Sequence, residues 1–335
     1  MSIESRLAAK KRSAKARKKA KAKAALDLAL IILIPVVVLV IVFIVVNNIK
    51  SKINDYSKCL TADGYVEDYN LSKEVTLPEL TYEAMKIKYE DFAPESQNIE
   101  DQIVIELKAK LPEEERPTEG DESEIKAAYI ALVTDENVEK YFAESLGEDY
   151  PHTAEGYRTY VKDTLTKTSY ESSINNTIVE YVVNGTTFAS LPEKYVDNWT
   201  QIYSNNTKAS FDNLKEIGYV TASNVYESYG GKKEFKKKMK EYATEVVKQD
   251  LALLAVYDKL GLSCSKADID EYINNNYVTS EKSLEDCKEQ YGENYMTLEC
   301  KTYKAVEALK AMIPTPETEK ANKDKDGDEN KDADK

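Results

Sequence analysis

The chain has little of the chemistry on which most enzymes and metal sites depend. Its 335 residues include one histidine, His152, one tryptophan and four cysteines. No two cysteines form C-x-x-C and the histidine is far from all four, so we expect no zinc site. The G-x-S-x-G, H-E-x-x-H and phosphate-loop motifs are missing as well. We therefore predict no catalytic residue, no metal and no cofactor, and a structural or exposed role for His152.

The cysteines are too few and too scattered to form a disulfide framework. They are Cys59, Cys264, Cys287 and Cys300. Free thiols are the simplest expectation, but outside the cell a disulfide becomes possible. Cys287 and Cys300 lie on consecutive predicted helices, so they are the favoured pair if one forms.

Charge is missing from one long stretch near the start. Residues 28–46 form a 19-residue run with no charged side chain and one proline, Pro35. As a helix this run would span roughly 28 Å, about the thickness of a bilayer core. No A-x-A site follows it, which argues against a cleaved signal peptide. We predict a retained transmembrane helix, with a cleaved signal or a soluble core helix as the alternatives.

The charges that are present divide sharply along the chain. Residues 1–27 carry ten basic and two acidic side chains, or +8, so a total of −14 leaves −22 for the rest. A basic arm beside a membrane helix stays cytoplasmic, and its placement favours this interpretation over a nucleic-acid arm. The acidic remainder is a poor nucleic-acid binder. We thus predict a single-pass protein whose N-terminus is inside and whose residues from about 48 onward are outside.

Residues 48–133 are predicted to form a small α+β segment with short β-strands. Apolar side chains alternate at Met85, Ile87 and Tyr89. Two strand-length runs follow, "DQIVIELKAKL" at 101–111 and "EIKAAYIALV" at 124–133. They are separated by the acidic turn or linker "PEEERPTEGDE".

Residues 134–313 have the pattern of a helical domain. Thr134 and Thr153 are placed to cap helices, Gly147 to end one, and Pro192 to begin another. The longest periodic segment ends at Gly261. Residues 314–335 are charged and poor in apolar side chains, which predicts a disordered acidic tail. A calcium-loop pattern in this tail has Ala333 where the loop requires Glu, so it does not indicate a metal site.

The order of these helical segments resembles a known family. The stretches that carry the resemblance are "TDENVEKYFAESLGEDYPHTAEGYRTYVKDTL", "LPEKYVDNWTQIY", "KKEFKKKMKEYATEVVKQDLALLAVYDKLGLSCSKADIDEYI" and "SLEDCKEQYGENYMTLECKTYKAVEALKAMI". Together they are similar to the C-terminal domain of trigger factor, a ribosome-associated bacterial chaperone, over about 134–313. The resemblance implies a mainly α chain with an elongated all-α domain of the trigger-factor-C-like or SurA-like type. Together with the predicted transmembrane helix, it leads us to expect the bacterial cell membrane as the location.

The departures from trigger factor refine the expected function. The ribosome signature and the glycine-rich, Phe-rich pocket of its FKBP-type isomerase domain are not recognisable here. We therefore expect an extracytoplasmic chaperone or foldase that binds unfolded exported polypeptides without ATP. The alternatives are a residual peptidyl-prolyl isomerase built from 60–133 and a surface-tethered structural or binding module. The residues predicted to contact clients, each with core packing as its alternative role, are Tyr195, Trp199, Tyr203, Tyr226 and Tyr229.

Overall fold

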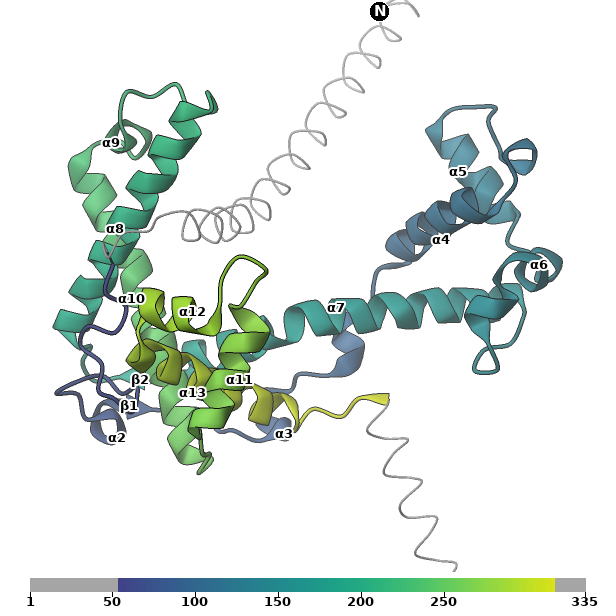
Figure 1. Cartoon of the computed structure of the whole chain (residues 1–335). Coiled ribbons are helices and arrows are strands. Elements are labelled where there is room, and N and C mark those ends of the chain that lie inside the picture. The colour runs from purple at the N-terminus through teal and green to yellow at the C-terminus, as the bar shows by residue number, and fades with distance from the viewer. Residues whose placement is uncertain (1–53, 317–335) are drawn as a thin grey trace, which may run out of the picture. The chain divides into compact units, whose positions relative to one another are not determined.

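The computed structural model describes residues 54–316 (Figure 1). These residues divide into two compact units. Unit 1 holds residues 54–67, 191–247 and 273–296, and unit 2 holds 68–190, 248–272 and 297–316. The predicted basic arm, the apolar run at 28–46 and most of the predicted tail lie outside the described residues. Within 54–316, no helix combines the length and apolar character needed to cross a membrane.

Helices make up most of both units, as predicted. Unit 1 contains α8 (Glu193–Glu216), α9 (Val225–Ser228), α12 (Leu284–Tyr291) and the first part of α10 (Lys232–Lys259). Unit 2 contains α2 (Leu71–Glu74), α3 (Tyr82–Met85), η1 (Tyr89–Phe92), α4 (Ser96–Lys110), η2 (Glu113–Glu115), α5 (Glu122–Ala131), α6 (Asp135–Leu146) and α7 (Ala154–Gly185). The boundary between the units passes through α10, α11 (Lys266–Asn276) and α13 (Glu293–Lys310).

The strands predicted at 101–111 and 124–133 are wrong. Residues of the first run belong to α4, where Ile103, Val104 and Leu107 recur at helical spacing and are buried. The second run lies mostly in α5, which begins at a capping box formed by Asp121 and Glu124. A short apolar run fits either structure by its composition, and here packing of α4 against α5 and α7 favours the helix.

Strand structure in unit 2 is limited to one short pair in the described chain. Strand β1 (Val75–Thr76) pairs antiparallel with β2 (Thr187–Phe188). Val75 lies opposite Phe188 in this register, and the Ala189 amide donates to the Glu74 carbonyl at 2.8 Å. The pair fastens the N-terminal part of unit 2 to the chain that leaves α7. The alternation at Met85, Ile87 and Tyr89 instead falls in α3, a turn and η1.

The predicted helix ends from 134 onward are confirmed. The Thr134 side chain accepts from the Asn137 amide, and α6 ends at Gly147 with a positive φ of 58°. The Thr153 side chain accepts from the Gly156 amide and starts the 32-residue α7. These signals act within one helical turn, so they can be recognised without knowing the tertiary fold.

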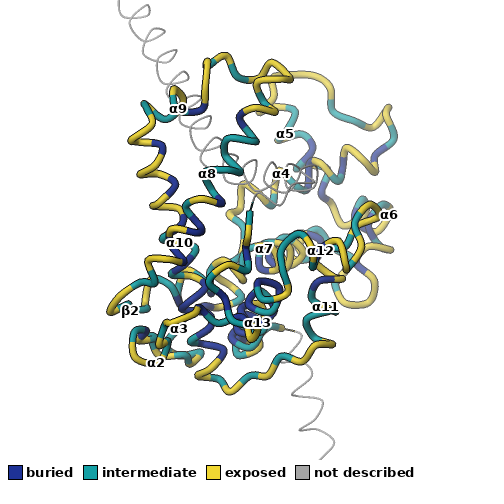
Figure 2. The backbone as a smooth tube through the Cα atoms, turned by 60° about the vertical axis from the view of Figure 1, so that its left-hand side comes forward, coloured by how far each residue is buried: buried dark blue, intermediate teal, exposed yellow. Residues whose placement is uncertain are grey.

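Helix α7 links two apolar clusters of unit 2. Near its start, Tyr157 and Val161 pack with α4, α5 and α6, and farther along, Ile174, Ile178 and Val182 pack with α10 and α13. The first cluster extends from Ile103 to Val161, so the boundary predicted at 133/134 passes through a continuous core. Burial along the backbone changes from turn to turn, as Figure 2 shows for α8 and α10.

Candidate functional site

Helices α8 and α10, joined through α9, carry a concentration of tyrosines in unit 1. We call residues 203–242 the tyrosine arm. Its partly or fully exposed apolar side chains include Tyr203, Ile217, Tyr219, Tyr226, Tyr229 and Tyr242. Five large apolar side chains of the described chain are classed as exposed, and Ile217, Tyr219 and Tyr242 are three of them. This concentration makes the arm the strongest candidate for an interaction surface.

Two of the predicted client-binding residues instead form the core beneath the arm. Tyr195 is fully buried and Trp199 is only 7% exposed. The Trp199 ring lies 5.8 Å from Tyr56 and 5.9 Å from Tyr295, both in edge-on geometry. Their aromatic surface is already covered by unit 1 itself. Tyr195 and Trp199 therefore position α8 and do not present a surface to a client.

The aromatic contacts continue from this core into the arm. Tyr203 lies one helical turn beyond Trp199, with ring centres 5.9 Å apart. On α10, Tyr242 lies 6.0 Å from Tyr203 and is 47% exposed. The predicted residue Tyr203 is thus half-buried between a core ring and an exposed one.

A small apolar cluster supports the arm near α9. Its buried members are Phe211, Val225, Phe235 and Met239. Tyr226 and Tyr229, both predicted client-binding residues, each set their rings edge-on to Phe235 at 5.2 Å. Both remain half-exposed, and burial raises the pKa of Tyr229, so its hydroxyl stays neutral. Each ring is fixed on one side and open on the other.

The most exposed apolar residues of the arm were missed by the sequence prediction. Ile217 is 66% exposed and Tyr219 is 81% exposed. They flank Gly218, whose φ of +78° ends α8, and the Tyr219 amide donates to the Leu214 carbonyl at 2.9 Å. Such an ending commonly buries the apolar residue after the glycine against the last turn. The pattern locates this apolar pair in the sequence, but only the structure shows that both side chains are exposed.

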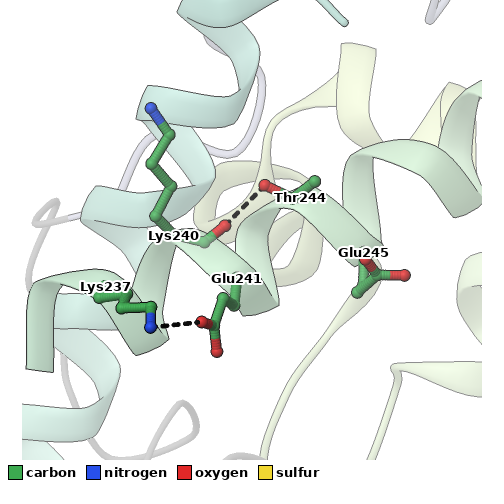
Figure 3. A pocket seen from close by; sticks show the side chains of 5 residues that line it. All are labelled: Lys237, Lys240, Glu241, Thr244 and Glu245. Carbon is green, nitrogen blue, oxygen red and sulfur yellow. Dashed lines mark hydrogen bonds and ion pairs between the residues drawn. The ribbon is translucent and has the colours of Figure 1, made fainter. Parts of the chain in front are cut away.

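The arm is also the most basic part of the helical segment. Six of the ten residues 232–241 are exposed lysines, against two glutamates. Figure 3 shows a depression lined by Lys237, Lys240, Glu241, Thr244 and Glu245, all on α10. Lys237 and Lys238 pair with Glu241 at 3.9 and 2.8 Å. One helix supplies the whole lining, so this is an open helix face carrying paired charges.

His152 has a structural role, as predicted. Its Nδ1 lies 2.7 Å from the Glu139 carboxylate and its Nε2 lies 2.9 Å from the Gly147 carbonyl. The bond to the Gly147 carbonyl, and then the bond to Glu139, raise the pKa of His152. Both contacts tie the loop before α7 to α6.

The predicted pairing of Cys287 with Cys300 is not found. All four cysteines are free thiols, and Cys300 in unit 2 has Cys264 as its neighbour, with the Sγ atoms 2.9 Å apart. Cys287 is buried in unit 1. The fact that Cys287 and Cys300 lie on consecutive helices therefore did not indicate which thiols are in contact.

Taken together, the described chain is a helical protein with exposed tyrosines on a helix pair, a surface suited to apolar partners. Residues 153–311 match the family described as bacterial trigger factor protein (TF) C-terminus. Neither the comparison with curated proteins nor that with solved structures found a match. The resemblance is confirmed over 153–311, and it indicates a chaperone-like domain family.

Proposed function

We propose that this protein is a membrane-anchored chaperone that binds unfolded exported polypeptides without ATP through the tyrosine arm. One observation carries the proposal: Ile217, Tyr219 and Tyr242 are exposed on the tyrosine arm, inside the segment that matches trigger factor. Exposed apolar groups gathered in one region commonly mark an interaction surface.

The arm has suitable dimensions and chemistry for an extended client. From Tyr203 to Ile217 the helix rises roughly 21 Å, the length of about six residues of extended chain. Tyrosine offers an apolar ring together with a hydroxyl that can remain hydrated, so it can contact many sequences. Several weak contacts along one chain reinforce one another once the first has formed. Binding of this kind needs no nucleotide.

The aggregation of a reduced, unfolded client tests the proposal. The full chain, purified in detergent, should suppress light scattering at an equimolar ratio, equally with and without ATP. A double variant, Ile217→Ser and Tyr219→Ser, should lose most of this effect while keeping its helical circular dichroism. The matched control is Ile105→Ser, which removes a 60% exposed side chain of α4 in unit 2.

The outcomes separate the two parts of the proposal. If the unmodified chain leaves client aggregation unchanged, the chaperone function is wrong. If the double variant suppresses aggregation as well as the Ile105→Ser control, clients bind elsewhere and the arm assignment is wrong.

The proposed extracytoplasmic location of the residues after the apolar run rests on that uncharged run at 28–46 and on the +8 arm before it. The full chain should remain with the membrane fraction after alkaline carbonate washing, whereas a chain lacking 1–46 should not. Protease added to intact spheroplasts should digest residues 54–316 and spare a tag at the N-terminus. Recovery of the full chain in the soluble fraction, or digestion of the tag, would overturn this part of the proposal.

A further inference from the structure

Two thiols of unit 2 meet without being bonded. Cys264 lies in the turn between α10 and α11, and Cys300 lies on α13. Their Sγ atoms are 2.9 Å apart, and a disulfide would bring them to about 2.0 Å. We propose that Cys264 and Cys300 are a modification site, where a disulfide oxidant converts the thiol pair into an intramolecular disulfide.

The turn that carries Cys264 is held against α13. Lys304, one helical turn after Cys300, donates to the Ser263 carbonyl at 2.9 Å. The same ammonium group lies 2.9 Å from the Asp268 carboxylate. Lys304 therefore fixes the backbone directly before Cys264, so the short Sγ to Sγ distance is supported by contacts outside the two thiols.

The start of α11 fixes the other side of the turn. The Ser265 amide and hydroxyl donate to Asp268 at 2.7 and 2.6 Å, and the Asp268 amide donates back to the Ser265 hydroxyl. The bonds from Ser265 and then Lys304 hold the pKa of Asp268 well below its usual range, so the carboxylate keeps its charge. The residues on both sides of Cys264 are thus anchored, which fixes the position of its backbone relative to α13.

The exposure of the two thiols sets the order of the chemistry. Cys264 is partly exposed, whereas Cys300 is buried, and burial followed by the contact with Cys264 raises the pKa of the Cys300 thiol. The Cys264 thiolate would attack a small disulfide such as glutathione disulfide and release one glutathione thiolate. Cys300 would then lose its proton, attack the Cys264 sulfur and release the second glutathione. The two cysteines lose two electrons and two protons, and the oxidant becomes two thiols.

The bond would close unit 2 upon itself. The chain leaves unit 2 after residue 272 and returns at residue 297. Cys264 lies shortly before the exit and Cys300 shortly after the return, both inside unit 2. A disulfide would therefore join the exit to the return across a separation of 36 residues. Closing a loop of this length restricts the unfolded chain and stabilises the folded one.

The test uses the full chain in detergent with Cys59→Ser and Cys287→Ala, so that only the pair remains. After incubation of the folded protein with glutathione disulfide, both thiols should resist maleimide labelling under denaturing conditions. The mass should fall by two hydrogen atoms, and a proteolytic map should join the peptides of Cys264 and Cys300. The apparent Tm should rise by roughly 5–10 °C and return on reduction.

A further variant and the unmodified chain complete the test. Adding Cys264→Ser to the same background should leave one labelled thiol and abolish the rise in Tm. If the Cys287→Ala change prevents folding, the proteolytic map of the oxidised, unmodified chain tests the proposal by itself, because it shows which cysteine peptides are linked. Two labelled thiols, a stable glutathione adduct on Cys264, or a link through Cys59 or Cys287 would overturn the proposal.

Discussion

The rings of Trp199 and Tyr203 lie 5.9 Å apart on successive turns of α8, the first buried and the second half-exposed. This pair marks where α8 passes from the core of unit 1 into the tyrosine arm. The same helix therefore uses its aromatic residues for two purposes, packing at one end and an accessible surface at the other.

This division predicts that two aromatic substitutions will have very different effects on stability. Trp199→Ala should lower the free energy of unfolding by about 3–5 kcal/mol, because it leaves a cavity among Tyr56, Tyr195 and Tyr295. Tyr219→Ser should change it by no more than about 0.5 kcal/mol, since the ring is 81% exposed. Urea unfolding followed by circular dichroism measures both values. Equal midpoints for the two variants would contradict the assignment of Trp199 to the core.

A buried tyrosine hydroxyl supports the fold of unit 2. Tyr157 is fully buried, stacks on Phe142 at 4.2 Å and donates to Glu106 at 2.8 Å. Tyr157→Phe should cost about 1–3 kcal/mol, because Glu106 Oε2 loses its donor in a partly buried position, while Gln102 still donates to Oε1. Tyr150→Phe is the control, since its bond to Asp163 at 3.0 Å is exposed, and it should cost less than about 1 kcal/mol. Denaturant unfolding of both variants decides.

Tyr157 also predicts a loss of stability in alkali. Burial, followed by the bond to Glu106, raises the pKa of Tyr157 far above its ordinary value near 10. A raised pKa contributes stability that is complete below pH 10 and is lost as the pH rises toward the pKa of the folded state. Tyr157→Phe should therefore show a smaller fall in Tm between pH 9 and pH 11 than the unmodified chain. An identical fall in both proteins would contradict the raised pKa of Tyr157.

At Gly156 we expect an alanine substitution to change stability in the direction opposite to that expected from helix propensity. It occupies the first turn of α7, where an added Cβ would collide with the Pro151 carbonyl oxygen. Glycine to alanine usually favours a helix by about 1 kcal/mol, but this rigid backbone contact should make Gly156→Ala destabilising by about 1–3 kcal/mol. Asn176→Ala, at an exposed position of α7, should be neutral or stabilising by up to about 0.7 kcal/mol. A higher Tm for Gly156→Ala than for Asn176→Ala in thermal unfolding would contradict the predicted clash.

His152 gives a prediction near neutral pH. Its contacts with the Gly147 carbonyl and Glu139 raise its pKa, so the protonated ring is favoured in the folded state. The stabilisation is complete below its ordinary pKa near 6.5 and disappears as the pH rises through the folded-state pKa. The Tm of the unmodified chain should therefore decrease more between pH 5.5 and pH 8.5 than the Tm of the His152→Gln variant. Parallel curves for the two proteins would contradict this assignment.

The sequence by itself determined the features that act over a few residues. Thr134, Thr153 and Gly147 set helix ends through bonds within one turn, and the order of helical segments was enough for the resemblance to trigger factor over 153–311. The apolar run at 28–46 and the charge division around it are equally local, and they carry the prediction of a membrane anchor.

The tertiary structure alone decided which partners cover each side chain. Residues 101–110 are helical because α5 and α7 bury Ile103 and Leu107, a choice that composition leaves open. Trp199 and Tyr219 are both aromatic, but only packing separates a buried ring from an exposed one. Cys300 meets Cys264 across 36 residues because Lys304 and Asp268 hold the turn against α13. Burial and long-range contact depend on where the helices pack, and no local pattern contains that information.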